Sequence, residues 1–280
     1  MTMTESQPTA VLSAHTGLES GRGCGMETFS LKLDILGKPA CFHINVAPVQ
    51  ARLSDMAPLA RALSTKLALV MLERLRESGK YVPCCKGCSA CCSYLIPLSV
   101  PEAFRLAQEL SAMPPEKGRT LLQSSLHAAK TILEQTPRDL NKDDLALTDG
   151  GIRSNQLGTW YAGLKLRCPF LSDNLCVTYD QRPIACREHV VVGSAVSCNI
   201  EGTDDPDVMK MPVSVLECLG RLAAKLEQSD AEAIMLPLAL PWAQENTERS
   251  NRTWSAMTMV GQFIEILQET DKAQISPANK

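Results

Sequence analysis

The cysteines of this chain fall into two blocks whose spacing is typical of metal ligands. The first block reads Cys85-Lys-Gly-Cys88-Ser-Ala-Cys91-Cys92, and the second runs from Cys168 through Cys176 to Cys186. A cysteine thiolate binds soft or borderline metals strongly, and two thiols separated by two residues can hold one ion from a single turn of chain. Core packing does not demand such spacings, so the two blocks predict a metal site rather than a set of unliganded thiols.

Eight cysteines are the candidate ligands: Cys85, Cys88, Cys91, Cys92, Cys168, Cys176, Cys186 and Cys198. Because Cys91 and Cys92 are adjacent, their side chains are expected to point in different directions, so only one of them is expected at any single ion. Eight thiols suit two four-ligand sites, or one cluster with a structural metal beside it. Zinc and iron–sulfur clusters both accept four thiolates, so the ligand types leave both cofactors open.

Three further side chains lie close to the second block in the sequence. His189 follows Cys186 by three residues and is either another ligand or a surface residue. Arg182 and Arg187 are either ordinary surface charges or donors of hydrogen bonds to thiolates, which would offset the negative charge of a cysteine-rich site. In the first block, Gly87 allows the sharp turn that the backbone needs beneath a metal.

Composition and charge restrict the compartment and the partners. The chain has 280 residues, 12 of them cysteine, which is too few and too clustered a set for a disulfide-built scaffold. The first 25 residues lack a positive start followed by an apolar segment, and no apolar run reaches the roughly 18 residues that span a bilayer. A reducing cytoplasm is therefore the expected location. The net charge of −3, without a dense Lys/Arg run, argues against nucleic-acid and membrane partners.

The elements that must position the cysteines are mostly helical. Segments 27–36 and 40–47 alternate in polarity around Gly37-Lys38-Pro39 and predict a β-hairpin. Residues 137–160 look like a polar connection, and Cys218 falls on an apolar helical stripe, which predicts a core thiol. Apolar residues at helical spacing predict helices near 55–78, 101–134, 213–228 and 253–268, and in the second of these Leu122, Leu126, Ala129 and Leu133 share one face.

These patterns predict an α+β fold that is mainly helical, with a small N-terminal β-hairpin and a cysteine-rich metal-binding core. Four regions are expected along the chain. They are a disordered tail at 1–25, a hairpin and helix at 26–80, a cysteine-cluster metal-binding domain at 81–200, and a C-terminal helical region at 201–280 that packs on it.

The cysteine motif resembles that of a known family. Cys85-x-x-Cys-x-x-Cys-Cys92 followed by Cys176-x-x-Tyr-x-x-Arg-Pro-x-x-Cys-Arg187 is similar to the YkgJ-like cysteine-cluster family (CxxCxxCC), described as zinc- or iron-chelating proteins. It also resembles the motif of flagellin lysine N-methylases, which implies an iron–sulfur cluster. The resemblance covers residues 85–198. It implies that Cys168 and Cys198 belong to the cysteine set of the family together with the six motif cysteines. Two positions depart from the family pattern. The family often has a glycine near the second cysteine, where this chain has Ser89 and Ala90, and it often has an aromatic residue at the position of His189.

Three functions remain open from the sequence. The first is a cytoplasmic metal-binding protein that holds an iron–sulfur cluster or zinc, without a reaction of its own. The second is an iron–sulfur-dependent enzyme that modifies a protein substrate, such as a lysine N-methyltransferase. The third is a zinc-stabilised module that binds a protein partner. No GxGxxG follows a strand and no P-loop is present, which argues against an ordinary nucleotide-dependent enzyme.

Overall fold

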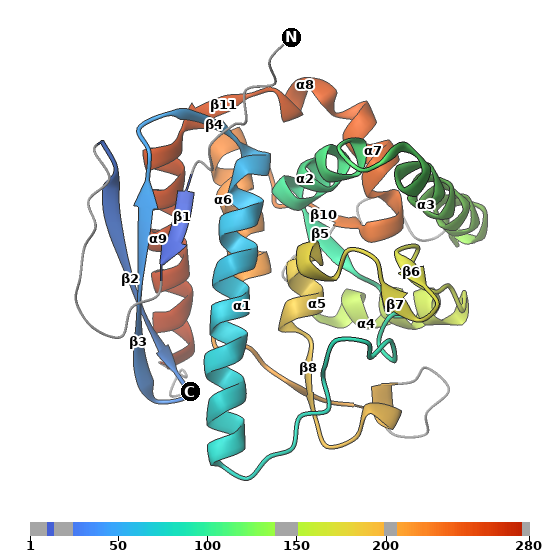
Figure 1. Cartoon of the computed structure of the whole chain (residues 1–280), viewed down its shortest axis with the longest axis horizontal. Helices are drawn as coiled ribbons and strands as arrows, with labels where there is room; N and C mark the ends of the chain where they lie inside the picture. The colour runs from blue at the N-terminus through green and yellow to red at the C-terminus, as the bar shows by residue number, and fades with distance from the viewer. Residues whose placement is uncertain (1–9, 14–24, 138–150, 199–205, 276–280) are drawn as a thin grey trace.

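A computed structural model describes residues 10–13, 25–137, 151–198 and 206–275 of the chain. Helices dominate these residues and the strands form small antiparallel sheets, so the predicted mainly helical α+β class is confirmed. Figure 1 shows α1 at the centre, with the N-terminal sheet and α9 on one side and the cysteine-containing segments on the other. Within the described residues, no helix combines the length and apolar character needed to cross a membrane.

The predicted N-terminal hairpin is present. Strands β2 (Glu27–Ile35) and β3 (Lys38–Val46) pair antiparallel, and Ile35 lies opposite Lys38. Leu36 and Gly37 between them both have positive φ angles, of 54° and 80°, as a two-residue hairpin turn requires. Strand β1 (Ala10–Ser13) pairs with the other edge of β3, so this part of the expected tail is paired in the sheet. The rest of that tail, up to residue 24, lies outside the described residues.

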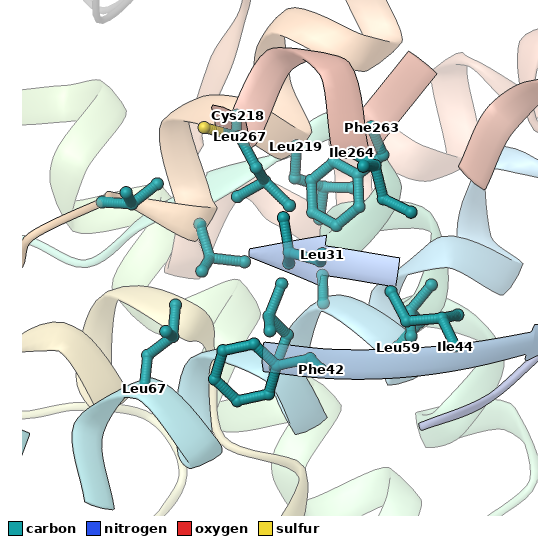
Figure 2. Packing of buried hydrophobic residues seen from close by; sticks show 14 of the residues in the cluster. Leu31, Phe42, Ile44, Leu59, Leu67, Cys218, Leu219, Phe263, Ile264 and Leu267 are labelled. Carbon is teal, nitrogen blue, oxygen red and sulfur yellow. The ribbon is translucent and has the colours of Figure 1, made fainter. Parts of the chain in front are cut away.

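The first hydrophobic core lies between the hairpin and three helices, α1 (Leu53–Glu77), α6 (Val215–Glu227) and α9 (Ala256–Ile275). The alternating residues of β2 and β3 and the helical stripes meet there. Figure 2 shows Leu31 of β2 close to Leu219 and Phe263, and Phe42 of β3 on the side of Leu67. Cys218 is fully buried in this core, as predicted.

The second core adjoins the cysteine region and includes Phe170 of the second block. Strand β5 (Pro97–Ser99) pairs with β10 (Ala233–Met235), and helices α2 (Val100–Ser111), α3 (Pro115–Gln135) and α7 (Ala239–Glu245) pack around them. The remaining short elements of this part are η4 (Leu236–Leu238), α8 (Thr247–Ser250), and the pair β4 (Gln50–Arg52) and β11 (Thr253–Ser255).

Two sequence predictions are wrong in this half of the molecule. The sequence predicted that the face of α3 with Leu122 and Leu126 would be buried, but these two side chains are 42% and 47% exposed. The buried face of α3 is the neighbouring one, which carries Leu121 and Ile132. Helix α4 (Gly151–Gly163) occupies a segment that the sequence predicted to be a polar connection. Its Leu157 and Tyr161 lie in a third small core with Ile132 of α3, and this packing stabilises the helix.

The cysteine region itself consists of short elements. After α4 come β6 (Leu171–Ser172), β7 (Leu175–Cys176), η2 (Tyr179–Gln181), α5 (Ile184–Glu188), β8 (Val190–Val192), η3 (Ala195–Cys198) and β9 (Asp207–Met209), which pairs with β8.

Candidate metal centre

The two cysteine blocks meet through their backbones. The amide of Cys168 donates a hydrogen bond of 2.7 Å to the carbonyl of Cys92. The first block has no regular helix or strand. It turns repeatedly, with the Cys88 amide bonded to the Cys85 carbonyl at 3.2 Å and the Cys92 amide bonded to the Ser89 carbonyl at 3.1 Å. Three thiols of this winding segment, those of Cys88, Cys91 and Cys92, line one cavity with the second block.

Gly87 has the conformation that the sequence predicted for it. Its φ angle is +96°, a left-handed conformation that other residues adopt only with strain. A methyl group at this position would lie 3.8 Å from the side chain of Leu175 in the second block. The turn of the first block therefore lies directly against β7.

The second block folds as a pair of short strands around a turn. Asp173 and Asn174 connect β6 to β7 and both have positive φ, of 50° and 63°, which suits a two-residue hairpin. The following α5 begins at Ile184, whose amide donates a 2.8 Å hydrogen bond to the carboxylate of Glu102 in α2. This bond fixes the start of the helix that contains Cys186.

A cavity of about 240 Å³ lies where the blocks meet. Apolar side chains and the rings of Tyr94 and Tyr179 form part of its wall, with Arg182 and His189 beside them. Six of the eight predicted ligands line it: Cys88, Cys91, Cys92, Cys168, Cys176 and Cys186. The donor set of this cavity is therefore thiol-rich and suits zinc or an iron–sulfur cluster.

The other two predicted ligands do not line this cavity. Cys85 is exposed, and Cys198 is buried at the end of η3 with 5% of its surface accessible. Burial, followed by the charge of Cys91, raises the pKa of Cys198, so the thiols of Cys91 and Cys198 lie within electrostatic reach of each other. The structure thus brings six candidate ligands around one cavity and leaves two at its periphery.

The thiols of the cavity influence one another strongly. Burial, followed by the charges of Cys176 and Cys91, raises the pKa of Cys168 to about 11. Burial, followed by the charge of Cys168, raises the pKa of Cys186 well above its ordinary value. Thiolates held this close repel one another, and a bound cation removes that repulsion.

Cys91 and Cys92 both line the cavity. Interaction with the Cys92 thiol, followed by burial, raises the pKa of Cys91. The chain turns tightly here, and the amide of Tyr94 bonds back to the Cys91 carbonyl at 3.1 Å. The expectation that only one of the two thiols binds any single ion stays a prediction.

The cysteine side chains are not yet arranged as a closed coordination shell. Across the described ranges, no three Cys, His, Asp or Glu side chains converge closely enough to hold an ion as they stand. A bound metal would have to draw the cavity thiols inward. A cysteine thiol can make this movement by rotation about a single bond.

The two arginines of the second block have different surroundings. Arg187 donates hydrogen bonds to the carbonyls of Arg182 and Asp180, at 3.0 and 2.6 Å, and to the hydroxyl of Thr65 in α1 at 2.6 Å. It therefore fastens the block to α1. Arg182 lines the cavity, and its positive charge lowers the pKa of Cys91 and Cys186.

Within the part of the chain that the structure describes, two side chains of the cavity have buried polar atoms without a hydrogen-bond partner. One is Nε of Arg182, whose guanidinium lies 4.2 Å from the centre of the Tyr179 ring. The other is Nε2 of His189, whose ring meets the edge of the Tyr94 ring at a centroid distance of 5.5 Å. Burial lowers the pKa of His189, which favours the neutral imidazole.

Sequence reasoning missed two residues that shape this site. Tyr94 directly follows the first block, but one aromatic residue beside a cysteine motif does not indicate which ring it will contact. Glu102 lies in α2, remote in sequence from both blocks, and no surface of its carboxylate-bearing side chain remains accessible. A fully buried acid can be recognised only once its amide partners are known.

The family comparison agrees with this site. Residues 84–210 match the family model CxxCxxCC, described as a putative zinc- or iron-chelating domain. Comparison with curated proteins and with solved structures gave no match.

Proposed function

We propose, from the match of residues 84–210 to the CxxCxxCC family of metal-chelating domains, that this chain is a metal-binding protein that holds an iron–sulfur cluster in the cysteine cavity. The observation that supports the proposal is the gathering of six motif cysteines, from two blocks far apart in the sequence, around one small cavity. The proposed principal ligands are Cys91, Cys168, Cys176 and Cys186. The charge of each of these thiols raises the pKa of another member of the group, or its own pKa is raised by the charge of another member.

The size of the cavity favours a cluster over a single zinc ion. Zinc and a cluster each take four thiolate ligands, so the six cysteines that line the cavity do not separate the two. A cavity of about 240 Å³, however, exceeds the space that one ion needs when four thiolates surround it directly. Cys88 and Cys92 are then alternative ligands or neighbours of the cluster, and Cys85 and Cys198 are proposed as peripheral thiols.

The surroundings of the cavity suit a cluster that carries negative charge. Arg182 supplies a positive charge that stabilises the thiolates of Cys91 and Cys186. Hydrogen bonds, net charge and solvent exposure set the reduction potential of a cluster, so this side chain is proposed to tune it. The cysteines of the described ranges are all free thiols, which agrees with a proposed location in the reducing cytoplasm.

The proposal is tested by purifying the protein without oxygen, recording its absorption spectrum and measuring iron, acid-labile sulfide and zinc. We expect a brown protein with iron and sulfide in stoichiometric amounts. Cys186→Ser should lose most of the iron, whereas Cys41→Ser should retain it, because Cys41 is an exposed thiol on the hairpin. A colourless protein loaded with one equivalent of zinc would contradict the cluster and favour a zinc-stabilised module.

A further inference from the structure

We propose that His189 is a ligand of the metal centre, so that the cavity provides a mixed cysteine and histidine coordination shell. The proposal rests on the metal-binding function above and deepens it by adding a nitrogen donor. Its basis is the place of the imidazole in the cavity wall and the state of its Nε2 atom.

The local chain geometry directs both side chains to the same place. Cys186 lies within α5, and His189 is the residue at which that helix ends, three positions later. Residues three apart on a helical turn lie on one face. The amide of His189 still bonds to the carbonyl of Ala185 at 3.1 Å, so the helical turn extends far enough to keep this relation. Both side chains line the cavity.

Among the described residues, the Nε2 atom of His189 has no hydrogen-bond partner, and the atom is buried. Leaving such a group unpaired costs about 1–3 kcal/mol, so a partner is expected. Tyr94 meets the ring edge-on with the planes 85° apart, which restricts the orientation of the imidazole.

The other unpartnered polar atom of the cavity cannot act in this way. Nε of Arg182 belongs to a guanidinium, which is a hydrogen-bond donor without a free lone pair. Its role is to face the negative charge of thiolates. A neutral imidazole nitrogen is instead a common ligand of zinc and iron. The chemistry of the two groups therefore assigns metal ligation to His189 and charge balance to Arg182.

Histidine ligation has a measurable electronic consequence. Replacing a thiolate by a neutral imidazole removes one negative charge from the coordination shell, and histidine-ligated clusters have higher reduction potentials than all-cysteine clusters. We therefore expect His189→Cys, if the cluster assembles, to shift the potential to a more negative value. A histidine that only packs against the cluster would not produce this direction of change.

The decisive experiment is pulsed electron paramagnetic resonance of the reduced protein, prepared once normally and once with ¹⁵N-labelled histidine. We expect a strongly coupled nitrogen that changes with the label and disappears in His189→Ala and His189→Gln. The matched control is His127→Ala, which removes an exposed histidine of α3 and should keep the coupling. Iron and sulfide are measured on every sample.

The possible outcomes separate the two proposals. A cluster without a coupled histidine nitrogen overturns the ligation and leaves the cluster intact as a function. A protein that contains zinc instead overturns the cluster. X-ray absorption at the zinc edge then decides the ligation: loss of a nitrogen scatterer in His189→Ala but not in His127→Ala supports it, and an unchanged all-sulfur shell overturns it. Circular dichroism of the variants confirms that each has folded.

Discussion

At the scale of single residues, two arginines five positions apart in the sequence have different functions. Arg187 directs its donors to two backbone carbonyls and a hydroxyl, whereas Arg182 lies over Tyr179 in the cavity wall. The sequence alone, which shows two positively charged residues close to Cys186, does not distinguish Arg182 from Arg187. Only their hydrogen-bond partners separate a residue that fastens the block from one that faces the thiols.

We expect Arg187→Ala to destabilise the protein, because three hydrogen bonds from a charged group are lost and the turn at 180–182 is released from Thr65. The free energy of unfolding should fall by about 2–4 kcal/mol. Arg182→Ala should change stability less and should reduce the metal content or lower the reduction potential. Urea unfolding and metal analysis of both variants make the comparison. Equal losses of stability would contradict the distinct functions.

The sequence predicted the chemistry of the site better than its geometry. Thiol spacing identified the six cavity cysteines, because spacing limits which side chains can reach one ion. It also included Cys85 and Cys198, which do not line the cavity, and expected Cys91 and Cys92 to point in different directions, whereas both line the cavity. Those differences depend on how the backbone turns, and local spacing does not determine the turns.

At the scale of elements, Glu102 connects α2 to the cysteine region. Its carboxylate accepts hydrogen bonds from the amide of Ile184 at 2.8 Å, and from the amide and hydroxyl of Ser99 at 3.3 and 3.1 Å. Burial raises its pKa, while these donors and the charge of Arg61 act in the opposite direction. One side chain thus holds both the start of α2 and the start of α5.

We expect Glu102→Ala to lower the free energy of unfolding by about 2–5 kcal/mol, because it leaves buried donors unpaired. It should also weaken metal binding, since α5 carries Cys186 and loses its anchor. The matched control is Glu116→Ala at the exposed start of α3, for which a change within about 0.5 kcal/mol is expected. Chemical denaturation and metal titration measure the two effects, and wild-type values for both in Glu102→Ala would refute the link.

A second carboxylate connects α9 to the hairpin and predicts a pH dependence. Asp271 accepts a hydrogen bond of 3.1 Å from the amide of Asp34, and burial raises its pKa above the ordinary value of 3.8. A raised carboxyl pKa favours the folded state at pH below about 3.8, and this advantage is lost as pH rises through the folded-state pKa.

We therefore expect Asp271→Asn to be more stable than the wild type near neutral pH, because the amide oxygen can still accept the bond from Asp34 without a buried charge. The difference should shrink as the pH is lowered toward about 3.8. Thermal unfolding over a pH series measures it. Glu73→Gln, an exposed change on α1, should show no such trend.

Helices were predicted reliably where an apolar stripe coincides with strong helix-forming residues. The stripe of α1 at Leu63, Leu67 and Met71 is buried as expected. The stripe of α3 failed because both of its faces carry leucine, so the sequence does not indicate which face meets the core. Helix α4 was missed because its packing against α3 is a tertiary effect.

At the scale of the whole molecule, the cores do not follow the regions expected along the chain. The first core takes residues from the hairpin and α1, from Ile184 and Val190 of the cysteine region, and from α6 and α9. The division into four regions remains a prediction, since a boundary in sequence does not require a boundary in packing. These shared cores should hold the helical framework without a metal.

We expect metal removal to affect the molecule unevenly. A chelator, with reductant, should loosen residues 82–98 and 166–198 together, because the metal–sulfur bonds that join the two blocks are lost and the blocks contain few large apolar residues. Helices α1, α6 and α9 should persist, because they pack in the first core. Hydrogen exchange measured with and without metal shows the pattern. Uniform loss of protection would indicate instead that the metal supports the entire fold.

The packing of α9 on the N-terminal hairpin has a consequence for biosynthesis. The apolar face of β2 and β3 emerges from the ribosome long before residues 256–275 are made, since more than 200 residues separate the two partners. At about 5–20 residues per second, that face waits roughly 10–40 s for its final cover. During this interval Leu31 and Phe42 depend on α1 and on chaperones, so translation speed and chaperone supply are expected to govern how much of the nascent chain reaches its native form.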